Sequence, residues 1–316
     1  MPVIDTKDLA KSFDKIKAVD GISFSVEKGE LFCLVGPDGA GKSTIIRMLC
    51  GIIPPTSGSA TVLGNDIQKN KTELVKKIGY LSQRFSLYGD LTVDENIEFF
   101  ARIHLVEDFS KRREELLDFT RMKDARARLA DRLSGGMKQK LALACTLIHS
   151  PEVIFLDEPT TGVDPVSRRD FWKILSNLLH EGITIFMTTP YLDEAERCSR
   201  VAMMNHGKLL DLDTPQNIRD KMKGEVFEIL CNPVREAYRI AMEWKDIHEI
   251  QLYGDRLNVI LYSQGKTIES TISDLKSNGI TIESWRRIPP RLENVFVSMM
   301  GHQEELLEHE EQKEKK

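Results

Sequence analysis

The 316-residue sequence has few of the features that mark a membrane-spanning or disulfide-bonded protein. No apolar run approaches the roughly 18 residues that a spanning helix requires, and the first residues do not resemble a signal peptide. The five cysteines are far apart and form no CxxC pair and no Cys/His metal-ligand spacing. We therefore expect reduced cytosolic thiols and a chain that does not cross a membrane by itself.

Charge of neither sign is in large excess. The formal net charge is −5, with 41% hydrophobic and 29% charged residues, which is ordinary for a globular protein. This balance gives no general attraction to anionic lipid or nucleic acid, and we expect no nucleic-acid partner. The length fits one large domain or two unequal ones.

Three apolar segments predict the strands of a buried sheet, namely Leu31–Val35, Val153–Leu156 and Ile183–Thr188. Apolar residues at helical spacing follow the first strand in Lys42–Cys50, and a helix over about Val166–His180 precedes the third. Uninterrupted apolar strands that alternate with helices predict an α/β fold whose largely parallel sheet is covered on both faces.

The composition changes near residue 222. The pattern over 223–301 predicts a small α+β domain with the ferredoxin-like order βαββαβ. We therefore divide the chain into a domain 1–222, an accessory domain 223–301, and a charged tail 302–316 that we expect to be disordered.

A glycine-rich segment after the first predicted strand carries a phosphate-binding pattern. The residues GPDGAGKST, 36–44, fit G-x-x-x-x-G-K-[ST] between a buried strand and a helix. Glycines let backbone N–H groups curl around phosphate oxygens, and the helix N-terminus adds the positive end of its dipole. The lysine can reach the β- and γ-phosphates, and the next hydroxyl can ligate Mg²⁺. The residues expected to bind ATP here are Gly36, Gly39, Gly41, Lys42, Ser43 and Thr44.

Two carboxylates end the second predicted strand. In VIFLDEP, Asp157 and Glu158 stand at the carboxyl end of the strand, the edge where open parallel sheets bind ligands. We expect Asp157 to ligate Mg²⁺ together with Ser43. We expect Glu158 to orient or deprotonate the attacking water.

A second helix start that suits an anion lies between these motifs. The segment LSGGMKQK, 133–140, places Ser134 as an N-cap and puts Gly135 and Gly136 at the start of a helix. One phosphate site needs only one such helix end. We therefore expect the second end to serve the nucleotide of another molecule.

These motifs resemble those of ATP-binding cassette (ABC) ATPases over residues 3–220. In family order they are the phosphate loop, Gln83 in GYLSQRFSLY, the signature LSGGM, the Asp157–Glu158 pair, and GVDP at 162–165. The resemblance implies a mixed sheet with an antiparallel β subdomain and a helical subdomain inserted over about 85–150.

The resemblance also implies roles that single residues do not reveal. It places Phe13 against the adenine ring and Gln83 with the catalytic and Mg²⁺-binding groups. Without it, Phe13 fits core packing and Gln83 fits a polar residue at a strand end. It further implies a head-to-tail dimer in which two ATP molecules lie between one chain's phosphate loop and the other chain's signature helix.

Membrane partners follow from the same resemblance. The segment FSLYGDLTVDENIEFF, 85–100, is where the family contacts a membrane subunit, although its aromatic residues also fit core packing. The ending PPRLENVFVSMMG, 289–301, is similar to the C-terminal extension of ABC-2 type exporters. We expect an export ATPase on the cytoplasmic face of the inner or plasma membrane, bound to a permease and to a second cassette, as a homodimer or a heterodimer. The alternative is a soluble ABC-type nucleotide switch acting on a protein or nucleic-acid machine.

One residue departs from the family pattern. In MTTPYLDEAERC, Pro190 occupies the position where the family usually has a histidine that contacts the γ-phosphate. Proline also lacks a backbone N–H, so this position offers the phosphate no donor. Because Glu158 is present, the group that activates water is kept. We expect the chain's own site to bind ATP well and to hydrolyse it more slowly by roughly 10²–10³, as when one oxyanion donor is removed.

Overall fold

The computed structural model describes residues 2–84, 87–222, 224–244, 249–262 and 265–300. The expected tail 302–316 lies outside the described residues. The chain divides into two compact units, Met1–Thr214 and Pro215–Lys316, and each is described by itself. All five cysteines are buried and unpaired. In the part of the chain that the structure describes, no helix is long and apolar enough to span a membrane.

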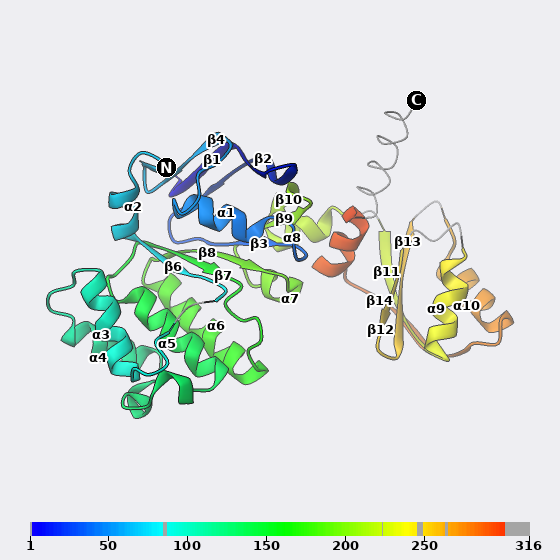
Figure 1. The fold of residues 1–316 in the computed structure, drawn as a ribbon. Coiled ribbons are helices and arrows are strands. Elements are labelled where there is room, and N and C mark those ends of the chain that lie inside the picture. The colour runs from blue at the N-terminus through cyan, green and yellow to red at the C-terminus, as the bar shows by residue number, and fades with distance from the viewer. Residues whose placement is uncertain (1, 85–86, 223, 245–248, 263–264, 301–316) are drawn as a thin grey trace. The chain divides into compact units, whose positions relative to one another are not determined.

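A six-stranded sheet forms the centre of the first unit (Figure 1). Its order is β10-β9-β3-β8-β7-β6, and every neighbouring pair is parallel except β9 with β10. The strands are β3 (Leu31–Val35), β6 (Ile78–Leu81), β7 (Val153–Asp157), β8 (Thr184–Thr189), β9 (Arg200–Asn205) and β10 (Lys208–Asp213). β3, β7 and β8 are buried along their whole length, which explains their uninterrupted apolar character. The predicted mixed, largely parallel sheet is confirmed.

A four-stranded antiparallel sheet, in the order β2-β1-β4-β5, shares the same hydrophobic core. Its strands are β1 (Ile4–Phe13), β2 (Ile16–Val26), β4 (Ser57–Val62) and β5 (Asn65–Asp66). Phe24 of β2 stacks on Phe32 of β3 and on Phe186 of β8, with ring centroids 5.3 and 5.8 Å apart. The helix α1 (Lys42–Leu49) adds Ile45 and Ile46 to this core, so it is held between the two sheets (Figure 1).

A helical region is inserted between β6 and β7, as the resemblance implied. It contains α3 (Val93–Ile103), α4 (Ser110–Phe119), α5 (Gly135–Leu147) and the short 3-10 turns Lys123–Ala125 and Ala130–Arg132. The other helices of the unit are α2 (Lys71–Lys77), α6 (Pro165–His180) and α7 (Leu192–Ala195). Asp164 starts α6 because its Oδ1 accepts hydrogen bonds from the backbone N–H groups of Val166 and Ser167.

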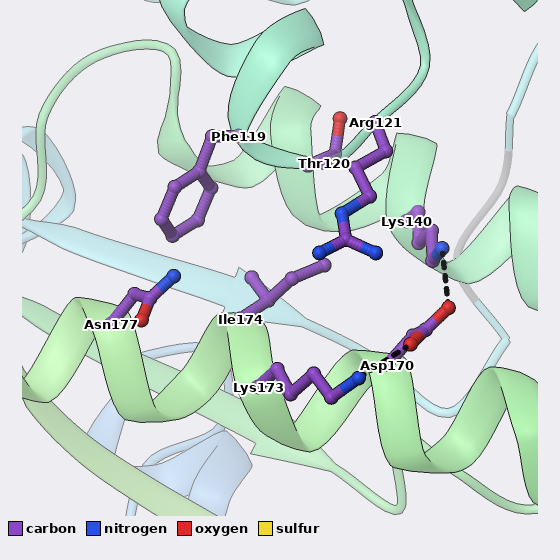
Figure 2. Close-up of a pocket in the computed structure, with 8 residues that line it drawn as sticks. All are labelled: Phe119, Thr120, Arg121, Lys140, Asp170, Lys173, Ile174 and Asn177. Atoms are coloured by element: carbon purple, nitrogen blue, oxygen red, sulfur yellow. Dashed lines mark hydrogen bonds and ion pairs between the residues drawn. The ribbon is translucent and has the colours of Figure 1, made fainter.

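One ion pair, between Lys140 and Asp170, attaches α5 to α6 (Figure 2). Lys140 of α5 lies 3.6 Å and Lys173 of α6 lies 3.4 Å from the carboxylate of Asp170. Arg121 points into the same small cavity, whose volume is about 40 Å³. Burial acts to raise the pKa of Asp170, but Lys140 and Lys173 outweigh it and hold the pKa below its ordinary value. One helix of the inserted region is therefore fixed to the helix that follows β7.

The second unit begins with α8 (Pro215–Asp220) and has the predicted order βαββαβ. Its elements are β11 (Gly224–Asn232), α9 (Val234–Met242), β12 (Glu249–Tyr253), β13 (Arg256–Tyr262), α10 (Ile268–Ser277) and β14 (Thr281–Ile288). The strands form one antiparallel sheet in the order β12-β13-β11-β14. α9 and α10 share a core with one face of this sheet. A helix over 292–300 is joined to Gln251 by a 2.8 Å hydrogen bond from Asn294 Nδ2 to Gln251 Oε1.

Candidate ATP-binding and hydrolysis site

The loop between β3 and α1 requires glycine at two positions where other chain segments approach closely. A Cβ at Gly36 would lie 2.1 Å from the carbonyl oxygen of Met204, and a Cβ at Gly41 would lie 2.2 Å from that of Ala18. Gly41 also has φ 103° and is the N-cap of α1, with no side chain capping the helix. The first N–H groups of α1 are therefore available to an anion, as a phosphate site requires.

Lys42 is turned inward beneath this loop and is only 4% exposed. Its Nζ donates to the carbonyl oxygens of Gly36 at 2.9 Å and Pro37 at 3.0 Å. The same Nζ lies 3.5 Å from Oε1 of Glu158. The cation of the loop and the carboxylate after β7 thus form a buried ion pair.

Asp157 has one satisfied and one unsatisfied carboxylate oxygen. Its Oδ1 accepts hydrogen bonds from Ser43 Oγ at 2.8 Å and from Thr188 Oγ1 at 2.7 Å. Its Oδ2 is buried and has no hydrogen-bond partner. A buried, unpaired carboxylate oxygen beside a hydroxyl fits Mg²⁺, which takes one or two protein oxygens and completes its shell with phosphates and water. The described residues contain no cluster of three His, Cys, Asp or Glu side chains that could hold a metal ion.

Glu158 is buried and has an unusual backbone conformation. Its φ is 50°, which for a residue other than glycine costs on the order of 1–3 kcal/mol and is most often found at functional sites. Its N–H donates to the carbonyl oxygen and Oγ1 of Thr188, both at 3.1 Å. Its Oε2 accepts from Gln83 Nε2 at 2.9 Å and from Thr161 Oγ1 at 3.3 Å. The carboxylate is therefore held from several sides.

The groups behind this site are kept neutral. Burial, followed by the nearby Asp157 carboxylate, raises the pKa of Tyr80 to about 12. The same two causes, in the same order, raise the pKa of the Cys50 thiol well above its ordinary value. Both side chains are therefore protonated and uncharged at neutral pH.

The signature residues lie elsewhere in the chain. Ser134 caps α5 by accepting a hydrogen bond from Met137 N at 3.4 Å. A Cβ at Gly135 would lie 4.0 Å from the carbonyl oxygen of Gly162, and a Cβ at Gly136 would lie 2.2 Å from Ser167 Oγ. For these two glycines the structure places the start of α6 and the residues before it as neighbours, not the phosphate loop. The structure thus brings together Lys42, Ser43, Gln83, Asp157 and Glu158. Gly135 lines a pocket with Gln83, but the nearest neighbours of the two signature glycines are not in the phosphate loop.

Two further positions that the sequence singled out are Phe13 and Pro190. Phe13, at the end of β1, is 48% exposed and carries Lys11 Nζ 5.1 Å from its ring centroid, so core packing does not account for it. Pro190 follows β8, and the N–H of Tyr191 donates to Thr189 Oγ1 at 3.1 Å. Sequence reasoning missed the contact of Thr188 with Asp157, although the paired threonines before Pro190 were visible.

The fold and this set of residues define the class of the protein. A phosphate loop connects a strand to a helix, and an Asp–Glu pair lies beside it at the carboxyl edge of the same sheet. This is the arrangement of a P-loop ATPase. The inserted helical region and the capped start of α5 are features that the sequence resemblance associated with the ABC ATPases among the P-loop ATPases.

Comparison with known proteins then identifies the family. The family model described as ABC transporter matches residues 19–161. The chain is 34% identical over 310 residues to the Nod factor export ATP-binding protein I of Sinorhizobium fredii, an alignment that covers 95% of this chain and 86% of that protein. The chain belongs to the ABC transporter family, and its enzymatic class is that of the ABC ATPases.

Two other similar proteins cover less of the chain. The probable multidrug ABC transporter ATP-binding protein YbhF of Escherichia coli is 42% identical over 219 residues, which are 69% of this chain but 38% of YbhF. The dimeric structure of a bacterial ABC transporter cassette superposes with a TM-score of 0.62 at 26% identity, covering 67% of this chain and 98% of that one.

Proposed function

We propose that this chain is the ATP-binding and hydrolysing subunit that energises export through a membrane-embedded permease of the ABC-2 type. The observation that carries the proposal is the meeting of Lys42 and Gln83 on the carboxylate of Glu158. The names of the relatives support export, since one is a Nod factor export protein and another a probable multidrug transporter subunit. We propose that the chain is cytoplasmic and that the permease holds it at the cytoplasmic face of the membrane.

The contacts of the site give each residue a role. Ser43 and Asp157 would hold Mg²⁺, which when bound neutralises charge on the β- and γ-phosphates. Lys42 exchanges its contact with Glu158 for phosphate oxygens. Glu158 then accepts a proton from the attacking water, with its orientation fixed by Gln83.

A second cassette completes the site in this proposal. The helix start formed by Ser134, Gly135 and Gly136 lies by Gly162 and Ser167, so it is offered to the nucleotide of another chain. The dimeric structure of a similar cassette supports such pairing. Phe13, half exposed at the end of β1, offers its ring to the adenine.

The replacement at Pro190 makes the chain's own site slow. Neither its side chain nor its backbone nitrogen can donate a hydrogen bond, whereas Asp157 and Glu158 keep their hydrogen bonds to Ser43 and Gln83. Binding of ATP is therefore kept while one γ-phosphate contact is absent in the transition state. Such a chain fits a homodimer with two slow sites, or a heterodimer in which its signature helix serves a faster cassette.

We propose that an aromatic surface made of Tyr88, Phe99 and Phe100 receives the permease. Tyr88 is 45% exposed, and its ring centroid lies 4.4 Å from that of Phe99. The buried Asn96 fixes the loop of Tyr88, because it accepts from the backbone N–H and donates to the carbonyl oxygen of that residue. Phe85, which the sequence grouped with these residues, lies outside the described residues.

Co-expression with a multi-span permease of the ABC-2 type tests the proposal. The full chain and its Glu158→Gln variant should co-purify with the permease, and only the former should hydrolyse ATP. A Tyr88→Ala/Phe99→Ala variant should keep its own ATP binding and lose the permease, whereas Tyr253→Ala, at an exposed tyrosine of the second unit, should lose neither. If the chain does not bind the permease and instead co-purifies in complexes that a nuclease disrupts, the export proposal is contradicted.

A further inference from the structure

A buried carboxylate outside the phosphate site joins two segments that flank Glu158. Glu194 of α7 is 1% exposed. Its Oε1 accepts a hydrogen bond from Thr160 Oγ1 at 2.6 Å, and its Oε2 accepts one from Thr189 Oγ1 at 2.8 Å. Arg168 Nε lies 3.5 Å from Oε1, an ion-pair distance without hydrogen-bond geometry.

These contacts are strong enough to hold backbone in place. A buried carboxylate is costly unless each of its oxygens finds a donor, so loss of either hydroxyl leaves part of that cost uncompensated. The 2.6 Å contact lies within the range of about 2.5–2.7 Å that is typical of a hydroxyl donating to a carboxylate, and the 2.8 Å contact has an ordinary O–H···O length. Glu194 therefore ties its two threonines together more firmly than a neutral side chain of the same size would.

The two threonines belong to the two segments that set the backbone of Glu158. Thr160 lies two residues after Glu158, in the turn where Thr161 N donates to the carbonyl oxygen of Glu158 at 3.2 Å. Thr189 directly follows Thr188, which accepts the N–H of Glu158 through both its carbonyl and its hydroxyl oxygen. Glu194 thus closes a loop of contacts around a residue whose φ of 50° needs support from its surroundings.

The same carboxylate reaches the residue before Pro190. Thr189 Oγ1 donates to Glu194 and accepts from the N–H of Tyr191, so one hydroxyl holds the chain on both sides of the proline. The hydroxyl of Thr189 in this way helps to fix the end of β8.

We propose that Glu194 is a positioning residue for ATP hydrolysis. Its carboxylate holds Thr160 and Thr189 so that Glu158 keeps the orientation in which it accepts a proton from water. It has no direct role in binding the nucleotide. The inference rests on the proposed role of Glu158 as the base.

Steady-state ATPase kinetics and ATP affinity of the full chain test this proposal. Thr160→Val and Thr189→Val keep side-chain size and remove one donor each, and Glu194→Gln keeps the size of the carboxylate side chain. Each should lower kcat by about tenfold, of the order of a general-base misalignment, while the Kd for ATP changes less than about twofold. The double variant Thr160→Val/Glu194→Gln should lose no more kcat than the worse single variant, because both substitutions disrupt the same Thr160–Glu194 hydrogen bond.

Thr120→Val provides the matched control, since Thr120 is a buried threonine whose hydroxyl bonds only the carbonyl oxygen of Leu116. It should leave both kcat and the Kd for ATP unchanged. Folded Thr160→Val and Thr189→Val variants with wild-type kcat would overturn the proposal, as would equal losses in kcat and ATP affinity. If Glu158→Gln itself hydrolyses ATP at the wild-type rate, the role of Glu158 fails, whatever the Glu194 variants do.

Discussion

Lys42 lies 3.5 Å from Glu158, so the cation of the phosphate loop and the carboxylate after β7 neutralise each other inside the protein. Both side chains are buried, and each has further partners: two carbonyl oxygens for the lysine, and Gln83 and Thr161 for the glutamate. Breaking one side of such a pair leaves the other charge without compensation.

Lys42→Met should therefore abolish ATP binding and destabilise the chain by on the order of 3 kcal/mol, because Glu158 is left as an unpaired buried charge. The double variant Lys42→Met/Glu158→Gln should recover part of that stability without recovering ATP binding. Urea unfolding with and without ATP measures both effects.

Lys76→Met is the control for this comparison. It breaks a 2.8 Å ion pair with Glu73 on the surface, where solvent screens the charges, so the free energy of unfolding should hardly change. Strictly additive effects of the two substitutions at the buried pair would show that Lys42 and Glu158 do not interact in solution.

Pro190→His should raise the ATPase rate of the purified chain by roughly 10–10³, because the imidazole supplies the γ-phosphate contact that proline cannot. ATP affinity should change little, since the phosphate loop is untouched. The ATPase rate of Pro190→Ala serves as the control, because this variant loses the proline ring without gaining an imidazole. A rate gain in Pro190→His that exceeds the gain in Pro190→Ala is therefore due to the imidazole. An ordinary cassette rate in the wild type, with no gain from histidine, contradicts the slow-site proposal.

Mixing two inactive variants tests whether a site needs two chains. Gly136→Ala forces a Cβ to within 2.2 Å of Ser167 Oγ and should spoil the signature helix start, whereas Glu158→Gln spoils the other half of the site. In a homodimer, an equal mixture should recover roughly a quarter of wild-type ATPase, because half of the dimers pair one variant with the other and hold one intact site. No recovery, with each variant folded and dimeric, argues that each chain works alone or that the natural partner is a different cassette.

His104 predicts a loss of stability in mild acid. Its ring stacks on that of His149 at 3.9 Å, and burial, followed by the charge of His149, lowers the pKa of His104 to about 4. Burial also lowers the pKa of His149. The unfolded chain therefore takes up protons near pH 6.5 that the folded chain does not, so stability is full above that pH and falls as the pH drops toward 4.

Urea unfolding midpoints between pH 7.5 and 4.5 measure this effect. His104→Phe keeps the stacked ring without the titrating nitrogen and should flatten the decline. An unchanged decline in that variant would assign the acid sensitivity to other groups.

Most of the fold could be predicted from the sequence, because uninterrupted apolar strands and the helices between them leave few alternatives to a covered parallel sheet. The contacts within the site depend on more than the order of motifs. Asp157 meets Thr188 because β7 and β8 pair in register at these residues, and no spacing in the sequence fixes that register. The sequence pattern also did not predict the positive φ of Glu158 or the burial of Glu194. The acidic run that contains Glu194 has the same composition as a solvated helix start.

The separation of Ser134 and its two glycines from the phosphate loop carries a kinetic consequence. If each site is shared between two chains, dilution alone switches the enzyme off: at concentrations below the dimer dissociation constant, the rate per chain rises in proportion to the amount of chain present. A permease that holds two cassettes side by side removes this dependence by raising their effective concentration. Hydrolysis would then be confined to the membrane assembly, and free chains would bind ATP without consuming it.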